Sequence, residues 1–229
     1  MKRKKIFYAE FAYVAGIVLL ALGTALMERA DYGMSMVVAP AYIVHRKLAQ
    51  VLPWFSFGVA EFALQAVLLV GLSLWLGRFR ISCLFSFATA VFYGAVLDLC
   101  ISAVALLPGT GIAARLACYA LGMLLCAAGV ALLFHTYIPP EAYELVVKEV
   151  ADRQRWDVGR VKTVYDCVSC ALGIVLSFAF FGWGRFEGVK AGTILCALVN
   201  GWLIGWIDRR LSASCDFREG LKLRGLFGK

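Results

Sequence analysis

The chain of 229 residues is 62% hydrophobic and only 17% charged, and its mean hydropathy is +0.81. A soluble domain carries about 45–50% apolar and about 25% charged residues, so this composition excludes an ordinary soluble globular protein. The formal charge of +8 does not indicate a nucleic-acid partner, because the basic residues stand at the ends of apolar segments and not in one patch. We therefore expect a single transmembrane domain over residues 1–229, with the lipid bilayer as its surroundings.

Long, continuously apolar segments recur along the whole chain. Each is long enough to cross a hydrocarbon core, which takes about 20 helical residues. None alternates between apolar and polar positions, so a β-barrel is excluded. The six predicted spans are about 7–27, 55–76, 81–107, 112–134, 158–181 and 189–207. The sequence therefore predicts an all-α polytopic membrane protein with six transmembrane helices.

Basic residues predict the orientation of these helices. Most of the 23 Lys and Arg lie in segments that share one side of the membrane: residues 2–5, the 78–80 turn, the 135–162 connection and the 208–229 tail. The positive-inside rule makes that side the cytoplasm. A signal peptide is the alternative for the basic N-terminus, but no small-residue cleavage site follows. We expect a protein of the bacterial inner (cytoplasmic) membrane with cytoplasmic N- and C-termini.

The two halves of the chain share an ordered series of short matches, offset by about a hundred residues. The matches pair Gly23-Thr24-Ala25-Leu26 with Gly129-Val130-Ala131-Leu132, Ala41-Tyr42 with Ala142-Tyr143, Gly58 with Gly159, Gly77-Arg78-Phe79 with Gly184-Arg185-Phe186, and Tyr93-Gly94 with Asn200-Gly201. Each half holds three spans, so the second half starts from the opposite side of the membrane. The sequence predicts inverted three-helix repeats over about 6–107 and 112–207, an arrangement common in secondary transporters.

Two apolar segments are too short to span the membrane and are interrupted by Gly or Pro. They follow the first and fourth spans, at residues 32–44 and 137–146, and contain Gly33, Pro40, Pro139 and Pro140. Broken segments at matching places in two repeats are typical of a transporter's binding site. They are either re-entrant segments or amphipathic helices in the interface, and both alternatives stay open.

Ionisable side chains inside the spans are costly in lipid, so each is a candidate functional residue. Glu61 and Gln65 share one helix face, as do Lys162 and Asp166, and the repeat aligns Glu61 with Lys162. We expect these faces to meet, with Glu61 neutralised by Lys162, either as a relay or solute clamp or as a static salt bridge. The predicted substrate-binding residues are Ser35, Tyr42, Glu61, Gln65, Tyr93, Asp98, Glu141, Tyr143, Lys162, Asp166 and Asn200.

Chemistry other than binding has little support in the sequence. Cys167 and Cys170 form a C-x-x-C that is typical of a redox or soft-metal pair, but small cysteines also suit close helix packing. No second pair or nearby His completes a site, and no nucleophile with a base is visible. We expect no enzyme activity, no cofactor and no bound metal.

Several motifs resemble the YczE/YyaS/YitT-like family of bacterial integral membrane proteins, in particular its small single-domain members of unknown function. They are residues 23–33 (GTALMERADYG), 35–42 (SMVVAPAY), 57–58 (FG), Tyr93-Gly94 with Asp98, 162–166 (KTVYD) and 192–201 (GTILCALVNG). The resemblance implies the fold and the location, but no established substrate. In size and span count the chain is also similar to the six-helix substrate-binding subunits of vitamin transporters.

These observations favour a small-solute transporter, or a substrate-binding membrane subunit, with a polar site between the two repeats. Acidic groups outnumber basic ones inside the spans, which favours a cationic or proton-coupled solute. The alternative is a non-transporting scaffold or regulator that binds a partner protein or lipid. A homo-oligomer and an energising partner both stay open.

Overall fold

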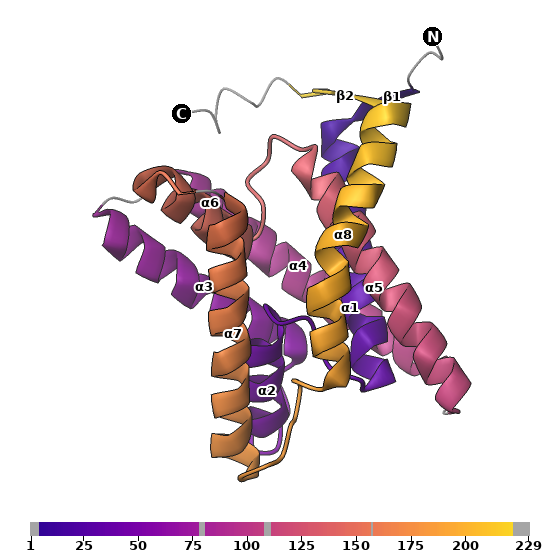
Figure 1. The fold of residues 1–229 in the computed structure, drawn as a ribbon, viewed down its shortest axis with the longest axis vertical. Helices are drawn as coiled ribbons and strands as arrows, with labels where there is room; N and C mark the ends of the chain where they lie inside the picture. Colours follow the sequence, from indigo (N-terminus) through magenta and orange to yellow (C-terminus); the bar gives the residue numbers. More distant parts are fainter. Residues whose placement is uncertain (1–4, 78–80, 108–110, 157, 222–229) are drawn as a thin grey trace.

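A computed structural model describes residues 5–77, 81–107, 111–156 and 158–221. Within these residues, six helices are long and apolar enough to cross a membrane, which confirms the predicted all-α polytopic fold (Figure 1). The elements are β1 Lys5–Tyr8, α1 Ala9–Ala30, α2 Ala39–Leu48, α3 Phe57–Leu76, α4 Ile81–Ala105, α5 Ile112–Phe134, α6 Ala142–Gln154, α7 Val158–Phe181, α8 Ala191–Ser214 and β2 Cys215–Arg218. The short helices α2 and α6 occupy the places of the two broken segments.

The ends of the chain differ from the prediction. The first spanning helix begins at Ala9 and not at residue 7, because residues 5–8 form β1, which pairs in parallel with β2. The last helix continues to Ser214, so the predicted tail begins as helix. The pairing holds the start and the end of the described chain together at one end of the molecule (Figure 1). The predicted basic residues at 2–4, 78–80 and 222–229 lie outside the described residues.

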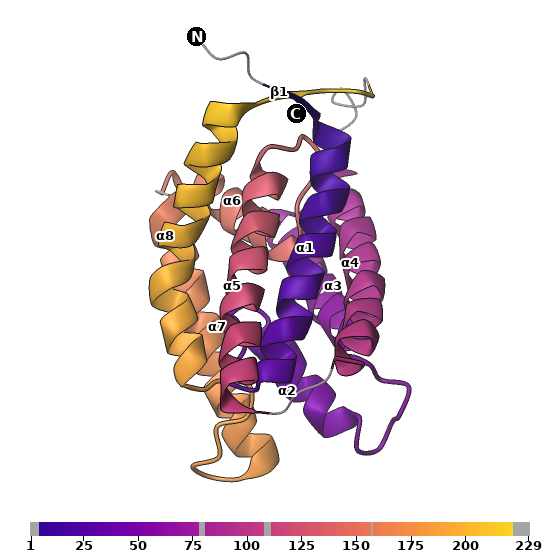
Figure 2. The same ribbon diagram turned by 90° about the vertical axis from the view of Figure 1, so that its right-hand side faces the viewer.

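Helices α1 and α5 pack antiparallel, and α5 lies between α1 and α8 (Figure 2). Glycines make this approach close. A Cβ atom on Gly23 would lie 2.6 Å from the Gly122 carbonyl oxygen, and one on Gly129 would lie 2.7 Å from the Gly16 carbonyl oxygen. Small residues let helix backbones approach in lipid, where apolar surface alone does not drive association. Four glycines therefore determine the distance between α1 and α5.

Glycine also sets the contact of α3 with α4. A Cβ on Gly94 would lie 2.6 Å from the Gly58 carbonyl oxygen. One turn beyond Gly94, the Asp98 Oδ1 atom accepts a 2.7 Å hydrogen bond from the Gly58 N–H, and Ser56 Oγ donates to Asp98 Oδ2. Asp98 thus satisfies one of the N–H groups that the start of a helix leaves without an intrahelical partner.

The two short helices each lie along the second half of a long one. In α2, Ala39 and Ile43 lie beside Gly173 of α7, and Lys47 Nζ donates to the Phe180 carbonyl oxygen at 3.1 Å. This arrangement is visible in Figure 1. Proline in the first turn of α2 suits a helix start, because that position needs no N–H.

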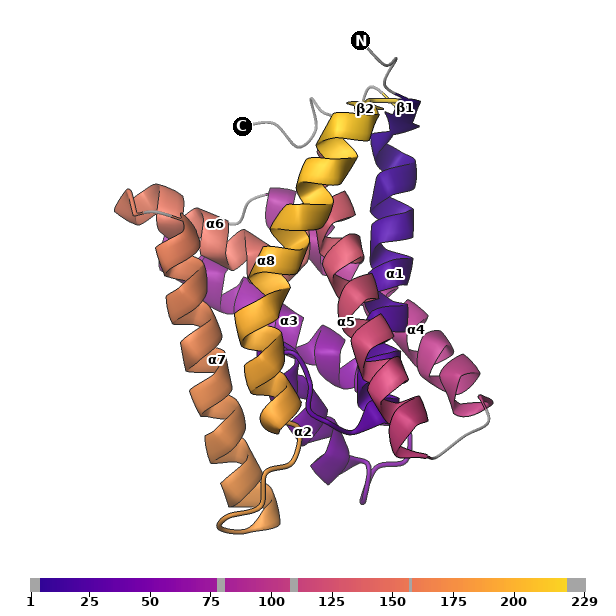
Figure 3. The same ribbon diagram turned by 45° about the vertical axis from the view of Figure 1, so that its right-hand side comes forward.

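Helix α6 runs along α3 in the same way. The Ala142 N–H donates to Gln65 Oε1, near the middle of α3, at 3.1 Å, and Arg153 donates to the carbonyl oxygen of Trp75 near the end of α3 at 3.4 Å. Helices α6 and α7 lie on one side of the molecule and α1 and α5 on the other (Figure 3). The start of α6 is therefore held deep among the long helices.

Candidate functional site

Polar side chains gather where the start of α6 meets α1, α3 and α4. We call this group the central polar cluster. Its members are buried or half-buried, and they are Tyr13, Thr24, Glu61, Gln65, Ser86, Thr89, Tyr93, Glu141 and Tyr143. The structure thus brings together five of the predicted site residues, which come from α3, α4 and the start of α6.

Side chains of α4 hold the Pro139-Pro140 break in place. Ser86 Oγ donates to the Pro140 carbonyl oxygen at 2.6 Å, and Thr89 Oγ1 lies 3.3 Å from the Pro139 carbonyl oxygen. Thr89 also hydrogen-bonds the Tyr13 hydroxyl at 2.6 Å. Irregular backbone deep in a membrane protein needs such internal partners. Ser86 and Thr89 therefore position the residues that open α6.

Three buried polar groups at this place are only partly satisfied. Glu61 is 0% exposed, and its Oε1 accepts a 2.7 Å hydrogen bond from the Tyr143 hydroxyl. Within the described parts of the chain, Glu61 Oε2, Gln65 Nε2 and Glu141 Oε1 are buried and have no hydrogen-bond partner. A buried polar group without a partner costs about 1–3 kcal/mol, and more when it is charged. A proton or a cationic ligand at this place would satisfy the two carboxyl oxygens, whereas the Gln65 amide nitrogen is a donor and needs an acceptor.

Lys162 does not pair with Glu61, and that expectation was wrong. Its Nζ lies 2.9 Å from Glu144 Oε1 and 3.4 Å from Asp166 Oδ1, in a group of half-buried side chains between α6 and α7. The physical reason is the position of α6, which packs against both α3 and α7. Tyr143 reaches Glu61 on one side, and Glu144 reaches Lys162 on the other.

Besides Lys162 and Asp166, four predicted residues lie away from the central polar cluster. Asp98 is bonded to the start of α3. Ser35 lies in the turn before α2, where its carbonyl oxygen accepts the Val38 and Ala39 N–H groups. Asn200 is half-buried in α8. Tyr42 packs edge-on against Phe57 at 5.3 Å between ring centres.

Sequence reasoning missed several members of the cluster. Tyr13, Thr24, Ser86 and Thr89 are uncharged, and uncharged hydroxyls inside spans also serve ordinary helix packing. Glu144 was recognisable only through its place after the Pro-Pro break. Cys167 and Cys170 are both free thiols, and Cys167 is exposed.

A second polar place, the distal pocket, lies at the end of α1 opposite to the chain termini. It encloses about 300 Å³ and is lined by Glu28, Arg29, Asp31, Tyr42, Arg46, Glu187 and Lys190. Its charges largely pair with one another. Lys190 Nζ lies 2.6 Å from Asp31 Oδ1, and Arg46 lies 3.9 Å from Glu187. The distal pocket is therefore close to neutral.

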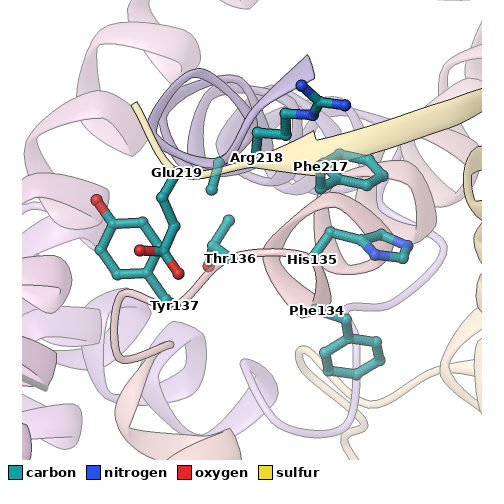
Figure 4. Close-up of a pocket in the computed structure, with 8 residues that line it drawn as sticks. Phe134, His135, Thr136, Tyr137, Phe217, Arg218 and Glu219 are labelled. Atoms are coloured by element: carbon teal, nitrogen blue, oxygen red, sulfur yellow. The ribbon is translucent and has the colours of Figure 1, made fainter. Parts of the chain in front are cut away.

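A third place, the terminal pocket of about 250 Å³, lies beside β2 (Figure 4). Figure 4 shows Tyr137 and Glu219 on one side of it and His135 and Phe217 on the other. The His135 ring stacks on Phe217 at 4.2 Å, and its Nε2 lies 2.9 Å from Asp208 Oδ1. Tyr137 donates to Glu10, and burial together with this bond raises the pKa of Tyr137 to about 12. Tyr137 therefore stays a neutral donor that joins α5 to α1.

Comparison with known proteins gives one relationship. The model of a family described as "Family of unknown function (DUF6198)" matches residues 7–209, which include most of every spanning helix. No curated protein and no solved structure matches the chain. Because the family match covers most of its length, the chain belongs to DUF6198, a family of unknown function.

Proposed function

We propose that this protein is a small-solute membrane transporter, or a substrate-binding membrane subunit, whose solute binds at the central polar cluster. The observation that carries the proposal is the set of buried atoms on Glu61, Gln65 and Glu141 that have no hydrogen-bond partner in the described chain. Ionisable groups deep in a membrane domain mark substrate and ion pathways. A static scaffold gains nothing from leaving such atoms unsatisfied.

We also propose that the halves are inverted repeats, and the glycine contacts support this. The alignment that pairs Gly23 with Gly129 also pairs Gly16 with Gly122. When each residue is replaced by its match in the other half, the contact between Gly16 and Gly129 becomes the contact between Gly122 and Gly23. The structure contains both contacts. Likewise α2 packs on α7 while α6 packs on α3. Both exchanges are what a twofold relationship between the halves requires.

In this proposal the two short helices are re-entrant and not interfacial. Helix α6 begins beside Gln65, near the middle of a helix long enough to cross the membrane. Discontinuous helices near the bilayer midplane are typical of transporter binding sites. The basic segments favour cytoplasmic termini in a bacterial inner membrane. The resemblance to the YczE/YyaS/YitT-like proteins is in keeping with that location.

The charges favour a small cation as the solute. Glu61 and Glu141 carry no ion pair among the described residues, whereas Lys162 is already paired with Glu144 and Asp166. A cation would neutralise the two carboxyls and give each of their unpartnered oxygens a partner. The proposed class is therefore a small cationic solute, taken up alone or coupled to protons.

A thermal-stability screen tests this function. The purified chain in detergent is unfolded in the presence of Na⁺, K⁺, guanidinium, choline or a short diamine, with urea and acetate as uncharged and anionic counterparts. A ligand that binds only the folded state raises Tm. We expect at least one cation to raise Tm for the wild type and for Asp152→Asn, an exposed change on α6. We expect no rise for Glu61→Gln; an equal rise there, or none in the wild type, contradicts the proposal.

A further inference from the structure

Glu61 and Glu141 are both deeply buried, at 0% and 7% exposure. They come from different segments, α3 and the residue that precedes α6, and among the described residues each has an oxygen without a partner. The two residues that follow Glu141 both contact the same face of α3: the Ala142 N–H donates to Gln65 Oε1 at 3.1 Å, and the Tyr143 hydroxyl donates to Glu61 Oε1 at 2.7 Å. Among the described residues, neither carboxyl forms an ion pair with Lys, Arg or His.

The groups around this pair cannot compensate two negative charges. The neutral groups near the pair are Tyr13 of α1, Tyr93 of α4, Cys126 of α5, Tyr143 of α6 and Tyr165 of α7. The charged groups nearby are Glu144, Lys162 and Asp166. Lys162 is the single cation in this group, and its two acidic partners already outnumber it. The surroundings therefore add further negative charge.

Two neighbouring carboxyls in a dry site do not both ionise, as paired carboxylates in other proteins show. A proton on either one turns an acceptor oxygen into a donor. The Tyr143 hydroxyl already donates to Glu61 Oε1, so Glu61 Oε2 is the oxygen left free to carry or receive that proton. One proton thus removes a charge and supplies a hydrogen-bond donor.

We propose that Glu61 and Glu141 form a proton-binding site that holds at least one proton at neutral pH. This inference deepens the proposed function, on which it rests for its role: the bound proton is the coupling ion, and a cationic solute displaces it. The exchange balances, since one positive charge enters the site as one leaves. The proton and the solute then use the same two carboxyls in turn.

Infrared spectroscopy of the purified chain in detergent tests the site directly. A protonated carboxylic acid has a carbonyl stretch distinct from that of a carboxylate, and it shifts in heavy water. We expect this band in the wild type at neutral pH, and we expect it to disappear as the pH rises. The band should persist in Asp152→Asn and be absent from the double variant Glu61→Gln/Glu141→Gln. A band kept in the double variant, or none in the wild type, overturns the proposal.

A second measurement does not depend on the folding of that variant. Wild-type chain labelled with ¹³C in the glutamate carboxyl should show the band at lower frequency, whereas a band from Asp98 or Asp166 would not move. An unmoved band overturns the assignment to Glu61 and Glu141. The readout is separate from solute binding: a shifted band without stabilisation by any cation keeps the proton site and removes the transport proposal. Stabilisation by a cation without the infrared band keeps the transport proposal and removes the proton site.

Discussion

At the scale of residues, the neighbours Tyr143 and Glu144 at the start of α6 serve different partners. Tyr143 donates to Glu61 of α3, and Glu144 accepts from Lys162 of α7. The first contact is fully buried and the second is half-buried. Tyr143 and Glu144 therefore lie between the buried carboxyls of the central polar cluster and the half-buried ion pairs of Lys162.

Tyr143→Phe should destabilise the protein by about 1–3 kcal/mol, because it removes the hydroxyl that donates to a buried carboxyl while leaving the ring in place. Tyr8→Phe is the matched control, since Tyr8 is 56% exposed in β1. Thermal unfolding in detergent measures both. Equal Tm values for the two variants would show that the Glu61 contact contributes nothing.

Part of this site was predictable from sequence. Glu61, Gln65, Glu141 and Tyr143 were selected because polar groups inside apolar spans and beside a Pro-Pro break are unusual, and they do come together. The partner of Lys162 was not predictable, because it depends on α6 lying between α3 and α7. The bonding of Asp98 to Gly58 likewise depends on how α3 crosses α4.

At the scale of elements, glycine positions decide which helices approach closely. Of the glycines in the sequence repeat, Gly23, Gly58, Gly94 and Gly129 lie at close helix contacts. Gly77, Gly184 and Gly201 do not, since no described atom lies within 4 Å of a Cβ added there. Periodicity and hydropathy predicted where the helices lie, but not the terminal strands, because their pairing joins residues at opposite ends of the chain.

Gly23→Ala should lower the free energy of unfolding by about 1–3 kcal/mol, since its Cβ would lie 2.6 Å from a backbone oxygen of α5. Gly71→Ala in α3 is the control. Nothing lies within 4 Å of its added Cβ, so the better helix propensity of alanine should leave stability unchanged or slightly higher. Chemical unfolding in mixed micelles compares them. A neutral Gly23→Ala would mean that α1 and α5 pack less closely than described.

At the scale of the whole molecule, the two halves of the proposed repeat differ in how their second and third spanning helices pack. Gly94 of α4 touches Gly58 of α3, while Gly201, its proposed match in α8, has no described atom within 4 Å of an added Cβ. In a protein built of inverted repeats, two conformations arise when the halves exchange their packing. The proposed repeat therefore predicts that α7 and α8 approach each other at Gly201 in a second conformation.

Gly201→Leu should therefore fold with a wild-type Tm yet stop solute movement, because the side chain fills space needed only in the second conformation. Gly71→Leu in α3, where no described atom lies within 4 Å of an added Cβ either, should fold and keep moving solute. Both are measured in liposomes with a cation that stabilises the wild type. Full activity of Gly201→Leu would contradict the proposed exchange of packing between the two halves.

The most direct test of the central claim is a measurement of the uptake of each cation of the panel, as a radiolabel, into liposomes that contain the purified protein under a pH gradient. Solute binding at Glu61 and Glu141 predicts uptake of at least one cation for the wild type and for Asp152→Asn, and none for Glu61→Gln. No uptake of any cation by the wild type, or equal uptake by Glu61→Gln, would contradict a transport site at the central polar cluster.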